Sequence, residues 1–427
     1  MILADVYTKG ITEDIDWNLG YEAVVKDAEE EPFDWCCNGR GGLDSWKAIG
    51  YIPVQDFDFK GYGTLTRSIS RTLEYSANDF VISQIAKGLG KNADAEKYLD
   101  RSSNWRNLFN STTQSTLNST NTGFVGYFQP RYLNGTWGYQ DPFKCSQVDP
   151  NPNSVCSLQN NGAETFESSV WEYGFFVPHD QGGLMKLYNG RENFINRLTF
   201  LHDGKVGDIG NEPSFLTVFQ FHYGGRPGLS AKRVHYYVGP GSAFTAGRDG
   251  IPGNDDSGAM GSFVAFCMMG LFPNPGQNVY LITAPFFKAV SITSPLTNKT
   301  ATIRIENFDP TYQNIYIQNA TLNGANYTRN WLTHDFFLNG GELILRVGLN
   351  ESLWGTRVED LPPSLSDYPA FNSSSLFGIA SLPPKIPRGN NATYHRPTQV
   401  VSPKPKSDGG YLGKTVSWLS GPPNVLV

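Results

Sequence analysis

The chain has 427 residues, of which 39% are hydrophobic and 13% are aromatic. This apolar content supplies a large core and excludes global disorder. Only 17% of the residues are charged, and 34 Lys and Arg against 40 Asp and Glu give a net charge of −6. Because phosphate neutralisation needs concentrated positive charge, the composition argues against nucleic acid as a partner. At roughly 150 residues per domain, the length predicts about three units or one large domain.

Helices dominate the expected structure of the first two thirds. The clearest is predicted over 64–87, where apolar residues recur every four positions and form one face. These residues are Leu65, Ile69, Leu73, Ala77, Val81 and Ile85. A second helix is predicted over 93–109, followed by polar loops over 110–165. Further helical patterns lie near 183–201, 214–223 and 257–271.

After Pro273 the sequence becomes rich in β-formers. In 342–348, Leu343, Leu345 and Val347 alternate with more polar residues, which is the period of a half-buried strand. From 361 onward Pro and Ser are frequent and indicate an extended tail that packs on the body. The domain prediction is therefore a helical portion over 1–275, a β-rich element over 276–360 and a tail over 361–427. The other predicted strands cover 279–284, 300–306 and 314–321.

Two features bear on location. The longest apolar run, 263–272, is about half a bilayer span, so no membrane segment is expected. The start, MILADVYTKG, has neither the basic residues nor the apolar stretch of a signal peptide. Nine Asn-X-Ser/Thr sequons nevertheless favour a secreted glycoprotein, whose targeting segment is expected upstream. The sequons begin at Asn110, Asn118, Asn134, Asn298, Asn319, Asn326, Asn350, Asn372 and Asn391.

The five cysteines do not form a metal-binding pattern. Cys145 and Cys156 bracket a polar loop, and a local disulfide and a pair of free thiols are equally open. Cys267 sits in an apolar run and is expected to be buried. The adjacent pair Cys36 and Cys37 lacks zinc-ligand spacing.

Three segments concentrate residues that carry chemistry. In 164–180, the carboxylates of Glu164, Glu167 and Glu172 lie among aromatic residues, where desolvation raises a carboxyl pKa toward that of a general acid. The alternative is an aromatic core with solvated carboxylates. In 210–214, Asn211 and Glu212 offer oxygen ligands suited to calcium, or simply begin a helix. In 250–260, Asp255 and Asp256 precede an apolar helix, and Asp256 or Ser257 as its N-cap is the structural alternative.

These segments resemble glycoside hydrolase family 92, the calcium-dependent inverting exo-α-mannosidases. The resemblance rests on GNEPSF, on GIPGNDDSGAMGSF followed by MGLFPNPG, and on the run from Glu167 to Asp180. In the same order the chain carries ILADVYTKGI, YEAVVKDA, GRGGLDSWKAIGYIP, GYGTLTRSISRTLEYSANDFVISQIAKGLGK and GQNVYLITAPFF. It covers about 1–290 well and the remainder more loosely.

The resemblance implies a mostly α fold with a β-rich C-terminal part, an (α/α)6 toroid that this chain enters part-way and leaves incomplete. The family's N-terminal β-sandwich, its first barrel helices and its Trp-Asp-Thr-aromatic-Arg motif would then lie upstream. It also implies that the chain hydrolyses terminal α-linked mannose, with an α-1,2 bond expected, from mannose oligosaccharides or N-glycans. The alternatives are an inactive fragment and a carbohydrate-binding homologue without activity.

The family's site residues carry over by position. Glu167 matches the general acid, and Asp256 matches the general base, supported by Asp255 and Asn254. Asn211 and Glu212, with Asp256, are the expected calcium ligands. The expected substrate contacts are Asp255, Trp171, Glu172 and His179, where Glu172 departs from the Gln usual in the family.

Overall fold

The computed structural model describes residues 1–35, 38–56, 60–61, 67–151, 154, 156 and 163–369. These residues all belong to one compact unit, Met1–Ser381, and the second unit, Leu382–Val427, falls outside them. The Cys36–Cys37 pair and most of the predicted tail lie outside the described residues as well. The domain boundaries at 275 and 360 therefore stay predictions.

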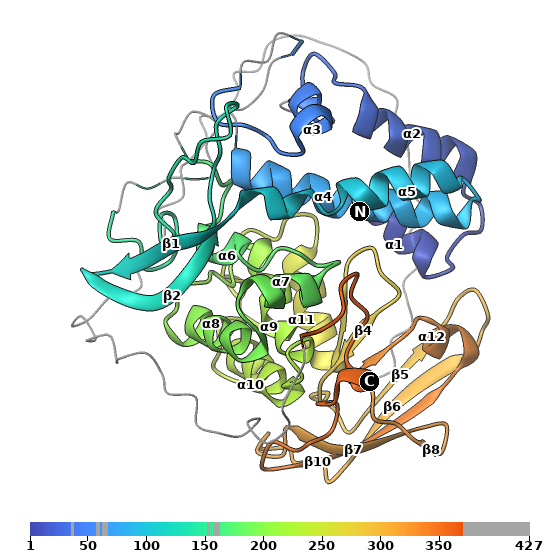
Figure 1. Ribbon diagram of the computed structural model, residues 1–427. Helices are drawn as coiled ribbons and strands as arrows, with labels where there is room; N and C mark the ends of the chain where they lie inside the picture. The colour runs from blue at the N-terminus through green and yellow to red at the C-terminus, as the bar shows by residue number, and fades with distance from the viewer. Residues whose placement is uncertain are drawn as a thin grey trace, which may run out of the picture. The chain divides into compact units, whose positions relative to one another are not determined.

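The first part of the chain is helical, as predicted, and Figure 1 shows α4 beside α5. Helix α4 packs on α1, α2 and α5. The helices that precede the first strand are α1 (Ile2–Thr8), α2 (Trp17–Glu29), α3 (Leu43–Ile49), α4 (Ser68–Gly88), α5 (Asn92–Arg101) and the 3-10 helix η1 (Asn104–Leu108). Those that follow are α6 (Val170–Tyr173), α7 (Gln181–Leu187), α8 (Arg191–Asp203), η2 (Glu212–Ser214), α9 (Phe215–Phe219), η3 (Gln220–His222), α10 (Pro227–Val238) and α11 (Ala259–Met269).

The predicted apolar face of α4 is confirmed. Its members between Ile69 and Ile85 are at most 4% exposed, while Leu65 lies outside the described residues. The pattern over 183–201 is two helices rather than one. It breaks at Asn189 and Gly190, whose φ angles of 58° and 108° are left-handed and incompatible with a continuous helix. In the pattern over 93–109 the α-helix ends at Arg101, and the 3-10 helix η1 follows it up to Phe109, which begins a strand.

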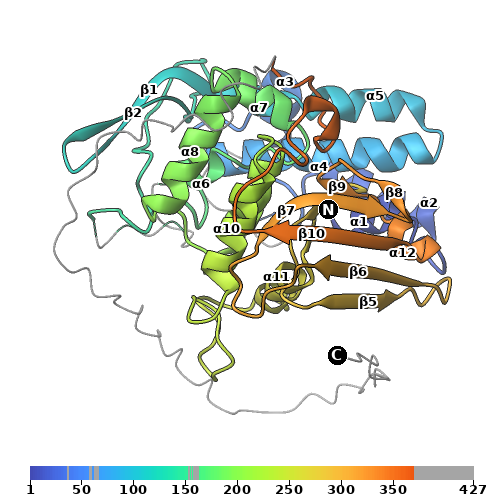
Figure 2. The same ribbon diagram turned by 90° about the horizontal axis from the view of Figure 1, so that it is seen from below.

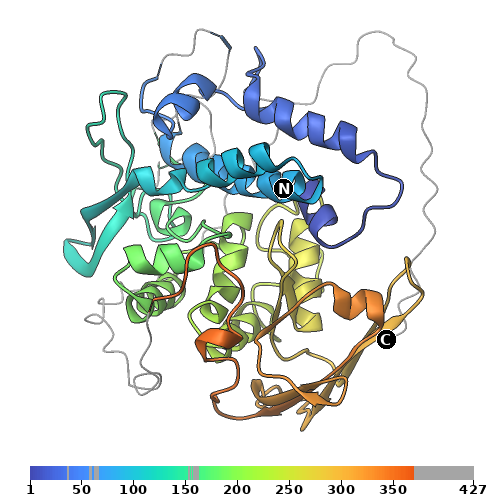
Figure 3. The ribbon, with the colours of Figure 1, turned by 45° about the vertical axis from the view of Figure 1, so that its right-hand side comes forward.

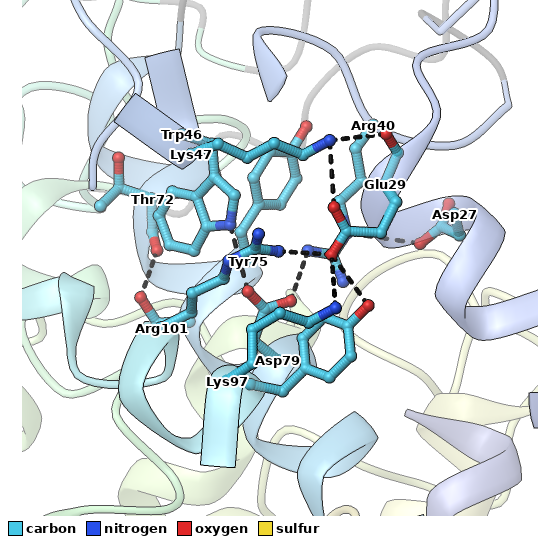
Figure 4. Close-up of polar contacts among 12 residues, drawn as sticks. Asp27, Glu29, Arg40, Trp46, Lys47, Thr72, Tyr75, Asp79, Lys97 and Arg101 are labelled. Atoms are coloured by element: carbon cyan, nitrogen blue, oxygen red, sulfur yellow. Dashed lines mark hydrogen bonds and ion pairs between the residues drawn. The ribbon is translucent and has the colours of Figure 1, made fainter. Parts of the chain in front are cut away.

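A buried ion pair connects the N-terminal helices (Figure 4). Arg40 donates to Asp79 of α4 at 2.7 Å, and Trp46 of α3 donates to the same carboxylate at 3.1 Å. Beside it, Glu29 of α2 accepts from Arg101 of α5 at 2.8 Å. Hydrogen bonds to Arg101 and other donors outweigh burial and lower the pKa of Glu29 to about 2. These contacts tie four helices together through charge as well as through apolar packing.

The prediction of polar loops over 110–165 is wrong for its first part. Strands β1 (Phe109–Leu117) and β2 (Thr120–Phe128) form an antiparallel hairpin. Its polar side chains satisfy one another inside the structure, since Ser115 contacts Thr122 and Tyr127, both at 2.6 Å. β-branched Thr suits a strand. The many Ser and Thr residues of this stretch therefore belong to a hydrogen-bonded hairpin rather than to loops.

The C-terminal part is β-rich, as predicted. A five-stranded sheet has the order β5-β6-β10-β7-β8, and Figure 2 shows β5, β6 and β10 side by side. Strand β10 is parallel to β6 and antiparallel to β7. In β10 the expected alternation is confirmed, because Leu343, Leu345 and Val347 are buried. The strands are β5 (Ala289–Thr293), β6 (Thr300–Glu306), β7 (Tyr316–Leu322), β8 (Ala325–Asn326) and β10 (Glu342–Gly348).

Short elements complete the fold. Strands β3 (Leu271–Pro273), β4 (Tyr280–Ile282) and β9 (Trp331–Leu332) form a second, three-stranded sheet. Helix α12 (Asp335–Asn339) packs on β6; in Figure 3 it is the short orange helix beside the orange strands of the sheet. The 3-10 helix η4 (Val358–Asp360) precedes the last described residues. Across the described ranges, none of the helices has the length and apolar character needed to cross a membrane.

Candidate active site

The loop that carries Glu167 is fixed to the start of α4. The Glu164 carboxylate accepts from the N–H of Ser68 at 2.8 Å, and its carbonyl accepts from that of Ile69 at 2.9 Å. Arg67 donates to the carbonyls of Ala163 and Thr165, both at 2.8 Å. Glu164 is therefore a helix-capping residue, and it satisfies N–H groups that the first turn of α4 leaves free.

Glu172 is also structural. It completes a capping box with Ser169 at the start of α6, and its other oxygen accepts from the N–H of Asp208 at 2.9 Å and from Ser214 at 2.7 Å. Its side chain is 2% exposed, and burial raises the pKa of this carboxyl. The expectation that Glu172 contacts substrate is not supported, because its oxygens face the protein. It links α6 to the 208–214 loop instead.

Trp171 and His179 lie in the core as well. Trp171 is 1% exposed and packs on Phe143 and Phe200. His179 is 2% exposed, stacks on Phe80 and contacts the carbonyl of Ser102 at 2.9 Å. The structure argues against sugar contacts by either residue, because neither ring presents a face to solvent. The alternative is half right: Trp171 is part of an aromatic core, but the carboxylate of Glu172 is buried rather than solvated.

Glu167 differs from its two neighbouring carboxylates. It is half-buried, and it has a left-handed φ of 57°, which is uncommon for a residue with a side chain. Burial, and after it the carboxylates of Glu74, Glu212 and Asp256, raise the pKa of Glu167 to about 7. A carboxyl with this pKa retains its proton near neutral pH and can donate it, which is the property of a general acid.

Backbone contact between two glycines joins the two other predicted segments. A Cβ on Gly253 would lie 1.8 Å from the carbonyl oxygen of Gly210, and a Cβ on Gly210 would lie 2.9 Å from that of Pro252. Both positions therefore require glycine, because the loops touch backbone to backbone. This contact brings Asn211 and Glu212 beside the loop that holds Asp255 and Asp256.

Asn211 and Glu212 connect this pair of loops to the Glu167 loop. Asn211 donates to Ser168, the residue after Glu167, at 3.1 Å. Burial and the carboxylates of Asp256 and Asp255 raise the pKa of Glu212. The Oε1 atom of Glu212 is buried without a hydrogen-bond partner. Such an atom normally has a partner, so this oxygen is available to a cation or a ligand.

The acidic loop begins α11 in an unexpected way. Asp255, not Asp256 or Ser257, holds the helix start: its carbonyl accepts from the N–H of Ala259 at 2.8 Å. Asp256 and Ser257 both have left-handed φ angles, of 44° and 64°, and are exposed. The structural alternative, in which Asp256 or Ser257 caps the helix, is wrong, since the N-cap residue is Gly258. The Asp256 carboxylate is thereby left free of a structural role.

Whether these residues can bind calcium depends on the oxygen atoms that they offer as ligands. Among the described residues there is no cluster of three or more His, Cys, Asp or Glu side chains placed to hold a metal. Asn211 supplies a further oxygen, and the free Oε1 of Glu212 lies in the field of Asp256. Carboxylate and amide oxygens of this kind suit calcium. The donors are of the type that calcium binds, and the buried Oε1 of Glu212, which lacks a hydrogen-bond partner, is the one among them that the structure leaves open to a ligand.

Sequence reasoning did not find Glu74. It lies on α4 and accepts from the hydroxyl of buried Tyr173 at 2.8 Å. Burial raises the pKa of Glu74, and its charge is the first after burial to raise that of Glu167. The only signal in the sequence is an acidic residue inside a predominantly buried helix.

Comparison with known proteins defines the class, which is that of the glycosyl hydrolases. The family model described as "Glycosyl hydrolase family 92 catalytic domain" matches residues 1–349 of the chain. The chain belongs to this family. An uncharacterized secreted glycosidase of Arthroderma benhamiae is 60% identical over 365 residues, which are 86% of this chain and 46% of that protein.

Solved structures agree with the fold. A family GH92 α-mannosidase from Bacteroides thetaiotaomicron, in complex with mannoimidazole, is 25% identical with a TM-score of 0.69, over 86% of this chain and 45% of its own. An inverting GH92 mannosidase from the same organism has the same identity and TM-score, over 85% of this chain and 47% of its own. The predicted toroidal glycosidase fold is confirmed, and the chain spans about half the length of these relatives.

Proposed function

We propose that the chain carries the catalytic carboxylates of a calcium-dependent, inverting exo-α-mannosidase. The observation that carries the proposal is the raised pKa of Glu167, to about 7, in the field of Glu212 and Asp256. One carboxyl is thus protonated near neutral pH while a second, exposed carboxylate stands close by. A glycosidase needs this division between acid and base.

The two carboxyls take different roles. Glu167 protonates the glycosidic oxygen as the bond to the terminal mannose breaks. Asp256 accepts a proton from a water molecule that attacks the opposite face of the sugar, and β-mannose is released. Inversion needs room for this water, so the carboxyl groups are expected to lie roughly 6.5–9.5 Å apart in the complex with substrate.

Calcium is proposed to bind at Asn211, Glu212 and Asp256. When bound, the ion holds sugar hydroxyl groups by charge and so positions the ring. The residues of the chain fix the donors: Ser168 orients the Asn211 side chain, and Gly210 against Gly253 fixes the backbone of both loops. Asp255 is proposed to contact the substrate from the same loop.

The proposed substrate is a mannose-containing oligosaccharide or an N-glycan with a terminal α-1,2 bond. Support for mannose as the sugar comes from the solved α-mannosidase in complex with mannoimidazole, whereas the α-1,2 linkage is supported only by the family resemblance. A secretory location is supported by the secreted relative. The side chains of Asn118, Asn134 and Asn350 are exposed, which allows glycosylation of these sequons.

The test is to incubate the purified chain with α-1,2-, α-1,3-, α-1,4- and α-1,6-mannobiosides, with calcium and with a chelator. Calcium-dependent release of mannose, seen first as the β-anomer by NMR and fastest from the α-1,2 compound, is expected. Glu167→Gln should abolish release while binding persists. Binding without turnover by the unaltered chain would favour a carbohydrate-binding homologue. The absence of both binding and turnover would favour an inactive fragment.

A further inference from the structure

A disulfide contacts the backbone of Glu167 through one of its two cysteines. Cys145 and Cys156 form a disulfide, which is one of the two states that the sequence left open. The N–H of Glu167 donates to the carbonyl oxygen of Cys156 at 3.1 Å. We propose that this disulfide is a positioning element for the general acid, so that catalysis depends on its being oxidised. The inference rests on the proposed function, because that function assigns the acid to Glu167.

One end of the disulfide is anchored in the core. Phe143, two residues before Cys145, is 1% exposed and packs on Trp171. The N–H of Trp171 donates to the carbonyl of Pro142 at 3.2 Å. The N–H of Cys145 donates to the carboxylate of Asp149 at 2.6 Å. Cys145 therefore belongs to a turn that is fixed to the same helix, α6, that follows the Glu167 loop.

The other end holds the Glu167 loop. Besides accepting from Glu167, Cys156 lies 3.8 Å from the hydroxyl of Thr165 through its sulfur. Thr165 in turn accepts from Gln140 at 2.8 Å. Cys156 is 3% exposed, so its carbonyl is an acceptor shielded from water. The covalent bond thus connects a fixed turn to the acceptor of the Glu167 amide.

The backbone of Glu167 needs such support. A residue with a side chain pays an energetic cost in the left-handed region, and the surrounding structure must hold it there. Without the disulfide, the position of the Cys156 carbonyl is no longer fixed to that of Cys145. The Glu167 backbone can then leave its left-handed conformation, which turns the carboxyl away from the glycosidic oxygen. Geometry of this precision matters because a small misplacement of a catalytic group lowers the rate steeply.

The test compares substrates that need the acid with substrates that do not. The group that leaves from a mannobioside is a mannose hydroxyl oxygen, which is a poor leaving group and requires protonation. The group that leaves from 2,4-dinitrophenyl α-mannoside is 2,4-dinitrophenolate, a stabilised anion that does not. In Cys145→Ala/Cys156→Ala, kcat on the mannobioside should fall by about 100-fold, within the range of general acid catalysis. On the dinitrophenyl substrate it should change by less than about threefold. Cys267→Ala, which alters a buried thiol away from this loop, is the control.

A second measurement does not depend on activity. Hydrogen exchange of the 163–169 segment should accelerate at least about tenfold in the double variant, while that of α4 stays constant. Reduction of the folded chain with a phosphine, with the fold checked by circular dichroism, should reproduce the effect if the double variant does not fold. Equal losses on both substrates, or unchanged exchange of 163–169, would overturn the proposal. Accelerated exchange in a chain without any mannosidase activity would instead overturn the proposed function alone.

Discussion

The hydroxyl of Tyr173 donates to the carboxylate of Glu74 at 2.8 Å, which holds a third carboxylate near Glu167. In Glu74→Gln the loss of this negative charge makes ionisation of Glu167 easier, so the pKa of Glu167 falls below its value of about 7. The alkaline limb of the kcat–pH profile should then move to lower pH, by up to about one unit. Glu96→Gln removes an exposed carboxylate from α5 and should leave the profile unchanged. An unshifted limb in Glu74→Gln would refute the electrostatic role.

The glycine contact between the two acidic loops gives a second prediction. Gly253→Ala forces the loops apart, because the added Cβ meets the Gly210 carbonyl. The free energy of unfolding from urea titration should fall by about 1–3 kcal/mol, and calcium affinity should fall with it. Gly261→Ala is the matched control. Gly261 lies in α11, and a Cβ added there would meet no atom closer than 3.9 Å. It should be neutral or stabilise by up to about 1 kcal/mol, as Ala does in helices.

Buried histidines predict acid sensitivity. Burial lowers the pKa of His202 to about 3 and those of His179, His222 and His235 to about 4. In the unfolded chain they titrate near 6.5, so below that pH the unfolded state binds more protons. The free energy of unfolding should therefore fall from about pH 6.5 toward pH 4, by at most about 1.4 kcal/mol per pH unit for each histidine.

The raised pKa of Glu167 acts in the opposite direction. Between about 4.5 and 7 the folded chain holds the extra proton, so this residue destabilises the fold as the pH rises. The histidine effect is therefore measured best in Glu167→Gln, by urea titration at pH 7, 6 and 5. This variant should also melt at a higher temperature than the unaltered chain at pH 8. A lower melting temperature there would contradict the assigned pKa.

The buried pair Arg40 and Asp79 gives a stability prediction. Arg40→Met leaves the Asp79 carboxylate buried without its cation and should lower the free energy of unfolding by about 3–5 kcal/mol. Arg40→Met/Asp79→Leu removes both charges and should recover most of this loss. Arg304→Met breaks an exposed pair with Glu342 and should cost less than about 1 kcal/mol. Similar losses in Arg40→Met and Arg304→Met would show that burial does not set the energy.

Elements with a strong period were predictable from the sequence. Helix α4 and strand β10 each bury one regular face, and that face is a property of the local sequence. The hairpin β1–β2 was not predictable in this way, because Ser115 and Tyr127 satisfy each other only after the strands have paired. The break at Asn189 and Gly190 is of another kind, because Asn-Gly is a local turn signal and both residues take left-handed φ angles.

The same distinction applies to the site. The motifs identified three segments, and the glycine contact and the Asn211–Ser168 hydrogen bond bring those segments together. The sequence did not separate Glu167 from Glu164 and Glu172, because all three are carboxylates among aromatic residues. A tertiary contact shows that Glu164 accepts a backbone hydrogen bond at the start of α4, whereas the capping box that Glu172 forms with Ser169, three residues before it, is a local pattern. Glu74 was missed for a related reason, since its neighbour Tyr173 is distant in sequence.

The last described residues have a consequence for synthesis of the chain. Asp180 is 1% exposed, and its carboxylate accepts from the N–H of Ser366 at 2.9 Å and from Arg106. Ser366 lies 186 residues later in sequence. At roughly 5–20 residues per second, a ribosome needs on the order of 10–40 s to produce it. During that interval both donors that Ser366 supplies to Asp180, its N–H and its hydroxyl, are absent, so the contacts of Asp180 are complete only after translation has passed Ser366.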